Sequence, residues 1–134
     1  METNRNREVV ERFFALSNSG DSEGCFKLFS DDVVWTDIGT SRFAGTYSGK
    51  QSVLNDLIIP LFSQLKAGIQ MRLENVISEG DQVVVQANGF AETLDGVPYN
   101  NSYCQVFRLR DGRICSVVEY CDTALINQVF ADER

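Results

Sequence analysis

The chain has 134 residues, 43% of them hydrophobic and 23% charged, a globular composition that predicts one domain over residues 1–134. Its formal net charge of −7 disfavours nucleic acid and anionic membrane surfaces as partners, because both would repel it. The sequence contains no histidine, which excludes imidazole-based catalysis and imidazole metal sites.

Location and metal content are also constrained by the sequence. No apolar run is long enough to cross a membrane, and the first residues, METNRNREVVERFF, are too polar for a secretion signal, so we expect a cytoplasmic location. The cysteines lack the spacing of a metal site. We therefore expect no metal and four reduced thiols: Cys25, Cys104, Cys115 and Cys121.

Two helices are predicted before the first strand. Val9, Phe13 and Leu16 recur at helical spacing, which predicts an amphipathic helix over residues 6–18. Asp21 is placed to cap a second, short helix.

The first predicted strand carries a carboxylate beside the only tryptophan of the chain. In the segment DDVVWTDIG, residues 31–39, Trp35 and Asp37 share one face. A carboxylate on an apolar face is partly removed from water, which raises its pKa toward the range useful for a general base. The alternative is that Asp37 only hydrogen-bonds to the backbone of the following turn.

A loop and a third helix are predicted next. Residues 39–49 contain three glycines and are predicted to form a loop. Ser48 and Gln51 form a capping-box pattern, which predicts a helix from about Gly49, and Pro60 is expected to kink or end that helix.

The C-terminal half predicts a four-stranded antiparallel meander. The alternating segments are joined by the turn sequences EGD, LDG and RDG, and helical spacing returns after Asp122. This order predicts an α+β fold in which helices close a curled sheet around a pocket. The predicted strands are 69–80, 81–94, 97–110 and 113–122.

Each of the last three strands has one face rich in amides, acids and rings. A mixture of this kind is typical of a ligand pocket, so we predict that this face points inward; the alternative is that it faces water. The residues are Gln86, Asn88 and Phe90, then Tyr99, Asn101, Tyr103, Gln105 and Phe107, and finally Glu119. The opposite face is apolar and predicts a homodimer interface: Val83, Val85, Ala87, Val118 and Tyr120.

Most of the chain resembles the nuclear-transport-factor-2-like superfamily of cone-shaped α+β domains. The similar segments are VVERFFALSNSGD, KLFSDDVVWTDIG, YSGKQSV and FRLRDGRICSVVEYCDTALI. The superfamily includes ketosteroid isomerases, SnoaL-like polyketide cyclases and limonene epoxide hydrolases. The resemblance implies a cystatin-like α+β barrel closed by N-terminal helices.

The resemblance to ketosteroid isomerases implies that Asp37 is the base that moves the proton. The oxyanion-hole tyrosine of those enzymes falls at Phe13 and its partner aspartic acid at Gln105. One donor is therefore lost and the other is replaced by an amide, which can still donate a hydrogen bond to a developing enolate.

The other two families match less well. In limonene epoxide hydrolases an Asp-Arg-Asp triad activates water; Glu119 matches the second acid, but Gln86 and Asn88 replace the arginine and the first acid. Epoxide hydrolysis is therefore disfavoured. The aspartate that SnoaL-like cyclases use matches Asp122, which could equally cap the last helix.

The sequence leaves two functions open. The first is cofactor-independent isomerase, cyclase or dehydratase chemistry on a small apolar carbonyl compound, with Asp37 as base, Glu119 as second acid, and Gln105, Asn88 or Tyr103 holding the oxyanion. The second is a non-catalytic module of the same fold that binds a ligand or a partner subunit, in which Glu119 has a structural role. The further side chains expected to contact a ligand are Phe13, Trp35, Tyr47, Gln86, Phe90, Asn101 and Phe107.

Overall fold

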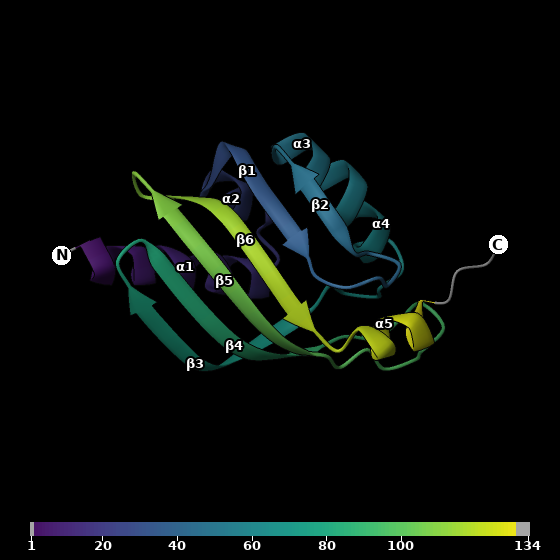
Figure 1. The fold of residues 1–134 in the computed structure, drawn as a ribbon. Coiled ribbons are helices and arrows are strands. Elements are labelled where there is room, and N and C mark those ends of the chain that lie inside the picture. The colour runs from purple at the N-terminus through teal and green to yellow at the C-terminus, as the bar shows by residue number, and fades with distance from the viewer. Residues whose placement is uncertain (1, 131–134) are drawn as a thin grey trace.

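The computed structural model of the protein describes residues 2–130 and begins with the two predicted helices (Figure 1). Helix α1 spans Glu2–Asn18 and α2 spans Ser22–Lys27. The Asp21 carboxylate accepts the Gly24 N–H at 2.8 Å, which confirms the predicted cap. Strand β1, Phe29–Asp37, follows directly.

The segment after β1 differs from the prediction. Part of the expected loop forms strand β2, Gly45–Ser48, which pairs antiparallel with β1 and sets Tyr47 opposite Trp35. The helical segment then consists of α3 (Lys50–Ser52), the π-helix η1 (Val53–Ile58) and α4 (Ile59–Phe62).

The predicted capping box does not form. Gly49 is the N-cap residue of α3, its φ of 90° favours glycine, and no side chain caps the helix. Pro60 lies in the first turn of α4, where its missing N–H costs little, and the helix ends two residues later at Phe62.

The four-stranded meander is confirmed, and it belongs to a larger curled sheet that does not close on itself. The strand order is β2-β1-β6-β5-β4-β3, and β1 pairs with β6 in parallel, so the sheet is mixed and not wholly antiparallel. Residues 91–101 connect β4 to β5, so both strands are shorter than predicted, and the predicted LDG turn forms within this connection: the Thr93 N–H donates to the Val97 carbonyl at 2.9 Å. The meander strands are β3 (Gln70–Glu79), β4 (Gln82–Phe90), β5 (Ser102–Arg110) and β6 (Arg113–Cys121).

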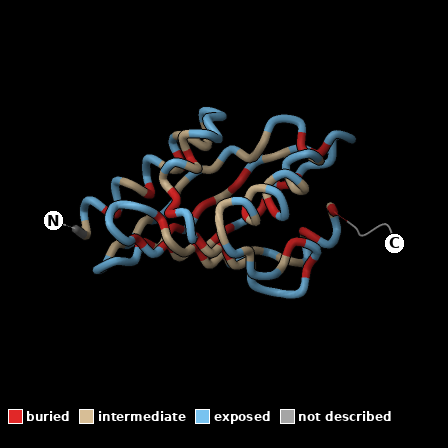
Figure 2. The backbone as a smooth tube through the Cα atoms, turned by 90° about the horizontal axis from the view of Figure 1, so that it is seen from above, coloured by how far each residue is buried: buried red, intermediate tan, exposed pale blue. Residues whose placement is uncertain are grey.

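Helix α1 lies behind the sheet in Figure 1, and α5, Thr123–Val129, extends from the end of β6. Most buried residues lie between the sheet and the helices, as Figure 2 shows. We call the side of the sheet that faces α1 the inner face and the other side the outer face. The pocket described below lies on the inner face.

The register shows which side chains share each face. Directly paired residues point to the same side of a sheet. Val85, Gln105, Glu119 and Asp37 form one inner row across β4, β5, β6 and β1.

Strand β4 corrects the predicted faces. Val83, Val85 and Ala87 are buried on the inner face and therefore do not form part of an outer interface. The polar set of this strand points outward, as the alternative interpretation held: Gln86, Asn88 and Phe90.

Gly89 provides space for an inner-face ring. A Cβ atom at this position would lie 2.7 Å from Cε2 of Tyr103, 3.0 Å from Ile69 and 3.1 Å from Met71. All three neighbours, Ile69, Met71 and Tyr103, line the pocket that is described below. Because Gly89 has no side chain, the Tyr103 ring can pack in the space that a Cβ atom would occupy.

We predict that Gly89→Ala lowers the free energy of unfolding by about 1–3 kcal/mol, because the added methyl group overpacks the inner face. Urea unfolding measures the change. Gln86→Ala, on the outer face of the same strand, is the control and should change stability by less than about 0.5 kcal/mol. Equal stability of Gly89→Ala and the native protein would contradict the packing argument.

Candidate functional site

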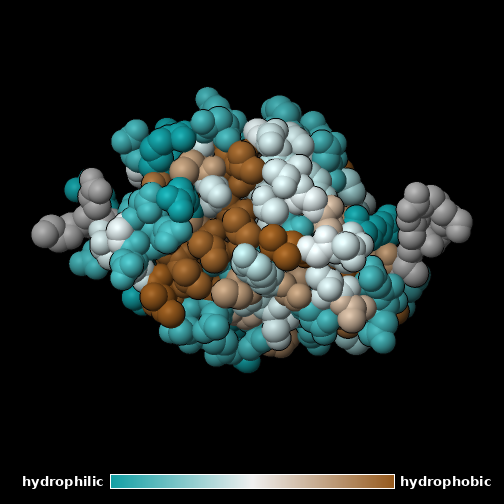
Figure 3. All heavy atoms as spheres, viewed as in Figure 1, coloured by the Kyte–Doolittle hydropathy of each residue, from teal (hydrophilic) through white to brown (hydrophobic). Residues whose placement is uncertain are grey.

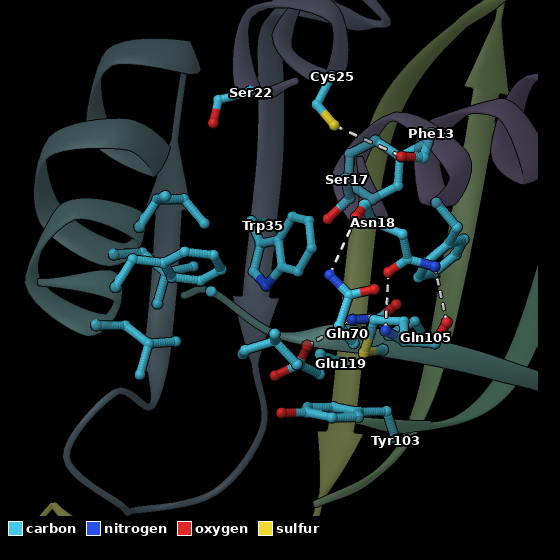
Figure 4. A pocket seen from close by; sticks show the side chains of 18 of the residues that line it. Phe13, Ser17, Asn18, Ser22, Cys25, Trp35, Gln70, Tyr103, Gln105 and Glu119 are labelled. Atoms are coloured by element: carbon cyan, nitrogen blue, oxygen red, sulfur yellow. Dashed lines mark hydrogen bonds between the residues drawn. The ribbon is translucent and has the colours of Figure 1, made fainter. Parts of the chain in front are cut away.

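A cavity of about 540 Å³ opens between the inner face of the sheet and the helices (Figure 4). Its walls are mainly apolar and its mouth carries uncharged polar groups from the end of α1 and the start of β3, such as Ser17, Asn18 and Gln70. The rings that line it are Phe13, Phe14, Phe26, Phe29, Trp35, Phe43, Phe62, Tyr99 and Tyr103. A cavity of this size and composition fits a small, largely apolar molecule.

The polar end of the cavity is a hydrogen-bonded row across three strands. The Trp35 indole N–H donates to Asp37 Oδ1 at 2.8 Å, and Gln105 Nε2 donates to Glu119 Oε1 at 2.6 Å. Asp37 and Glu119 are directly paired on β1 and β6 and interact through a carboxyl–carboxyl hydrogen bond. From β1 to β5, the row consists of Trp35, Asp37, Glu119 and Gln105.

The two carboxyls share a proton unequally. Burial raises the pKa of Asp37, while the hydrogen bonds from Trp35 and Glu119 oppose that rise. Burial and the charge of Asp37 raise the pKa of Glu119 well above its ordinary value. Glu119 therefore keeps the proton and Asp37 is the ionised partner, an acid and a base side by side.

Two tyrosine hydroxyls lie near this pair. Burial, with the neighbouring Tyr99 and Glu119, raises the pKa of Tyr103 well above 10, and burial raises the pKa of Tyr99 to about 12. Both hydroxyls therefore stay protonated and can donate. Figure 4 shows the Tyr103 ring beside Glu119, with its hydroxyl on the pocket side.

The structure brings six of the predicted residues to the pocket. They are Phe13, Trp35, Asp37, Tyr103, Gln105 and Glu119. One N–H of the Gln105 amide donates to Glu119 and holds that side chain in place. The Gln105 carbonyl oxygen Oε1 is buried without a hydrogen-bond partner.

The other six predicted residues lie outside the pocket. Phe107 is fully buried beneath it, with its ring 5.8 Å from that of Phe13, and the Tyr47 hydroxyl donates to the Phe43 carbonyl at 2.8 Å. Gln86, Asn88 and Phe90 point to the outer face, and Asn88 donates to Glu74 there. No signal in the alternating pattern of β4 distinguishes its faces.

Asn101 is the sixth residue, and its hydrogen bonds are structural. Its Nδ2 donates to the Tyr99 hydroxyl and to the Asp122 carbonyl, both at 3.1 Å. Its Oδ1 accepts the N–H groups of Ser102 and Asp122. The buried amide is therefore fully occupied in joining β5 to the end of β6.

Asp122 is a helix cap. Its carboxylate accepts the N–H groups of Ala124 and Leu125 at 3.1 and 3.3 Å at the start of α5. The side chain is not among the groups that line the pocket. The capping alternative therefore explains its position.

Sequence reasoning missed several pocket residues on the loops and helices. Phe43 comes from the loop between β1 and β2, Leu57 from η1, Met71 from β3, and Ile126 from α5. Apolar side chains in these elements looked like ordinary core residues.

Within residues 2–130, no group of three Cys, Asp or Glu side chains is arranged to hold a metal ion. Among the helices of the same residues, none is both long and apolar enough to span a bilayer.

Comparison with known families identifies the domain. The sequence profile of the SnoaL-like domain matches residues 10–117, most of the chain. The chain belongs to the SnoaL-like domain family. A search of curated proteins finds no match.

Solved structures show that the SnoaL-like domain has the nuclear-transport-factor-2-like fold. Bal32a, from a soil-derived mobile gene cassette, is 25% identical with a TM-score of 0.85, covering 98% of this chain and 100% of its own. An NTF2-like protein from Burkholderia pseudomallei is 20% identical with a TM-score of 0.83, covering 96% and 98%. An LEH-like epoxide hydrolase from M. tuberculosis is 18% identical with a TM-score of 0.77, covering 96% and 90%.

The site of this SnoaL-like domain lacks the arginine of the epoxide hydrolase triad. Gln86 and Asn88, which were matched to the arginine and the first acid, lie on the outer face. No arginine or lysine is found among the described residues that line the pocket. The two carboxyls therefore have no basic side chain beside them among the described residues of the pocket.

We predict that Glu119→Gln becomes more stable relative to the native protein as the pH rises. Because the folded pKa of Glu119 lies above its unfolded value, the folded state binds more protons between the two values, and the free energy of unfolding falls with rising pH. The variant lacks this titration, while its carbonyl can still accept from Gln105. We expect a relative gain of about 1 kcal/mol or more above the folded pKa.

Urea unfolding of the SnoaL-like domain between pH 5 and 9 measures this gain. Glu8→Gln, which neutralises an exposed carboxylate on α1, is the matched control and should follow the native profile. Parallel profiles for Glu119→Gln and the native protein would show that Glu119 has no raised pKa.

Proposed function

We propose that the protein is a cofactor-independent acid–base catalyst that moves a proton next to the carbonyl group of a small, largely apolar compound, as an isomerase, cyclase or dehydratase. The observation that carries the proposal is the pairing of Asp37 and Glu119 at the end of an open apolar cavity. One carboxyl is ionised and the other is protonated, so the site holds a base and an acid together.

Each group of the site has a role in this reaction. Asp37 takes the proton from the carbon next to the carbonyl, and the Trp35 N–H holds the carboxylate in position. The Tyr103 hydroxyl, or the Glu119 proton, donates to the oxygen that becomes an enolate. Gln105 is a positioning residue, because its amide bonds to Glu119.

The cavity favours catalysis over the non-catalytic alternative. A module without ligand chemistry would be expected to fill this space with the rings of Phe13, Trp35 and Phe107. Phe107 lies beneath the cavity, and Phe13 and Trp35 form parts of its wall, so about 540 Å³ remain open beside the acids. Two buried carboxyls also cost folding free energy, which a purely structural pocket would avoid by using apolar residues.

We predict that the native protein accelerates deuterium exchange next to the carbonyl of neutral bicyclic ketones such as 2-tetralone and 2-indanone. Proton NMR in D₂O measures the rate. Asp37→Asn should lower the catalysed rate by roughly 10²–10⁴-fold, because the base is lost while its shape is kept.

Asn88→Ala is the control for this assay, since Asn88 lies on the outer face, and it should exchange at the native rate. No acceleration by the native protein, or an undiminished rate in Asp37→Asn, would overturn the proposed chemistry. Ketone binding without exchange would favour the non-catalytic alternative.

We also propose that the protein pairs with a second copy through the outer face of the sheet. An apolar row crosses β3, β4, β5 and β6 on this side, and Figure 3 shows it as a hydrophobic band. The row consists of Ile77, Val84, Val106 and Val118, with Tyr120 beside it.

The charges at the rim of this face are paired within the chain. Arg72 bonds to Glu74 at 3.0 Å and Arg108 to Asp81 at 3.2 Å. The outer face therefore carries little net charge although the chain carries −7. Two identical acidic chains can approach there with little repulsion.

We predict that sedimentation at tens of micromolar shows a dimer and that Ile77→Lys raises its dissociation constant at least tenfold. Ile77 is 54% exposed in the single chain, so a lysine there can be accommodated in the monomer but not in an apolar contact. Gln82→Lys adds the same charge at the start of the neighbouring strand β4, outside the apolar row, and its dimer should dissociate less. A native monomer at these concentrations would contradict the proposal.

A further inference from the structure

The polar end of the cavity gathers several hydrogen-bond acceptors, and two of its N–H donors are already used. The Trp35 N–H is bonded to Asp37 and a Gln105 amide N–H is bonded to Glu119. No basic side chain of the described pocket donates a hydrogen bond to the remaining lone pairs of the two carboxyls. Gln105 Oε1 is a further acceptor, buried and without a donor, on the same row.

No fixed positive charge compensates these acids. The described lining residues include neither lysine nor arginine. The basic residues nearest in sequence to the two acids bond elsewhere: Arg42 donates to Gln64 at 3.4 Å, and Arg113 donates to the Lys27 carbonyl at 2.9 Å. The cavity is therefore electronegative at its polar end, within a chain of net charge −7.

Aromatic rings surround this end of the cavity. Trp35, Phe29 and Phe13 form a continuous wall, with centroid distances of 6.3 Å and 5.5 Å between successive rings. Tyr103 closes the site beside Glu119 (Figure 4). Ring faces attract organic cations, and this attraction is stronger where water is excluded.

We propose that the molecule bound in this cavity carries a protonated amine, which donates hydrogen bonds to Asp37 and Glu119 while its apolar body packs against the rings. An ammonium group has several N–H donors and one positive charge, which match the acceptors and the uncompensated charge of this end. The inference rests on the proposed function for the identity of the site and deepens it: the apolar carbonyl compound also has a basic nitrogen. Anionic compounds such as carboxylates or phosphate esters are excluded by the same charges.

Three probes of matched shape test the proposal: 4-phenylbutylamine, 4-phenylbutan-1-ol and 4-phenylbutyrate. Trp35 is the only tryptophan of the chain and lines the cavity, so its fluorescence reports binding directly. We expect the amine to bind at least tenfold more tightly than the alcohol and the carboxylate to bind most weakly. Equal affinity for amine and alcohol would overturn the proposal.

Two isosteric variants show whether the acids cause the preference. In Asp37→Asn the ratio of amine to alcohol affinity should fall toward one, whereas Glu119→Gln leaves the charge on Asp37 and should keep most of the ratio, with circular dichroism confirming the native fold of both. Glu8→Gln removes the same charge from the exposed surface of α1 and should keep the native ratio. An unchanged ratio in Asp37→Asn would mean that the general acidity of the chain attracts the amine, which would also overturn the proposal.

This result is independent of the exchange assay. Loss of the amine preference leaves base catalysis by Asp37 standing if deuterium exchange still requires that residue. Absence of exchange leaves the amine site standing if the affinity ratio still depends on Asp37.

Discussion

Parallel pairing between β1 and β6 is the constraint on which the site depends. It sets Asp37 directly beside Glu119, although one residue lies in the first strand and the other in the last. The antiparallel pairing of β6 with β5 then adds Gln105 to the same row. A shift of either strand by one residue would turn these side chains to the outer face and separate the pair.

Burial of the two carboxyl groups costs folding free energy, and hydrogen bonds from the surrounding residues reduce this cost. Each acid receives one N–H donor, from Trp35 or from Gln105, and the two share a proton. Sharing a proton halves the charge that must be buried. The same shared proton provides one acid and one base at the same position. The feature that lowers the cost of burial therefore also provides the proposed chemistry.

The aromatic wall and the fully bonded amide of Asn101 give the site its shape. Ring contacts connect α1, β1 and β5 around the cavity, and Asn101 fixes the Tyr99 hydroxyl at its edge. Gly89 leaves room for the Tyr103 ring. Rigid walls of this kind leave space for a ligand because the large side chains are held back from the centre.

Much of the fold could be predicted because its signals are local. Helical spacing marked α1, Asp21 marked the start of α2, and alternation marked β1 and the meander, since each pattern depends on neighbours within a few residues. Strand β2 was not predicted, because four residues in a glycine-rich segment become a strand only by pairing with β1.

The sequence by itself determined the chemistry available: no histidine, one tryptophan two residues before an aspartate, and a glutamate in the last strand. Only the tertiary structure decided which groups meet. Alternation shows that two faces exist but not which one is buried, and β4 turned Val83 and Val85 inward and Gln86 outward because of the helices packed against it. The partners of a buried polar group are equally non-local, so the roles of Asn101 and Gln105 followed from strand register and could not be inferred from spacing along the chain.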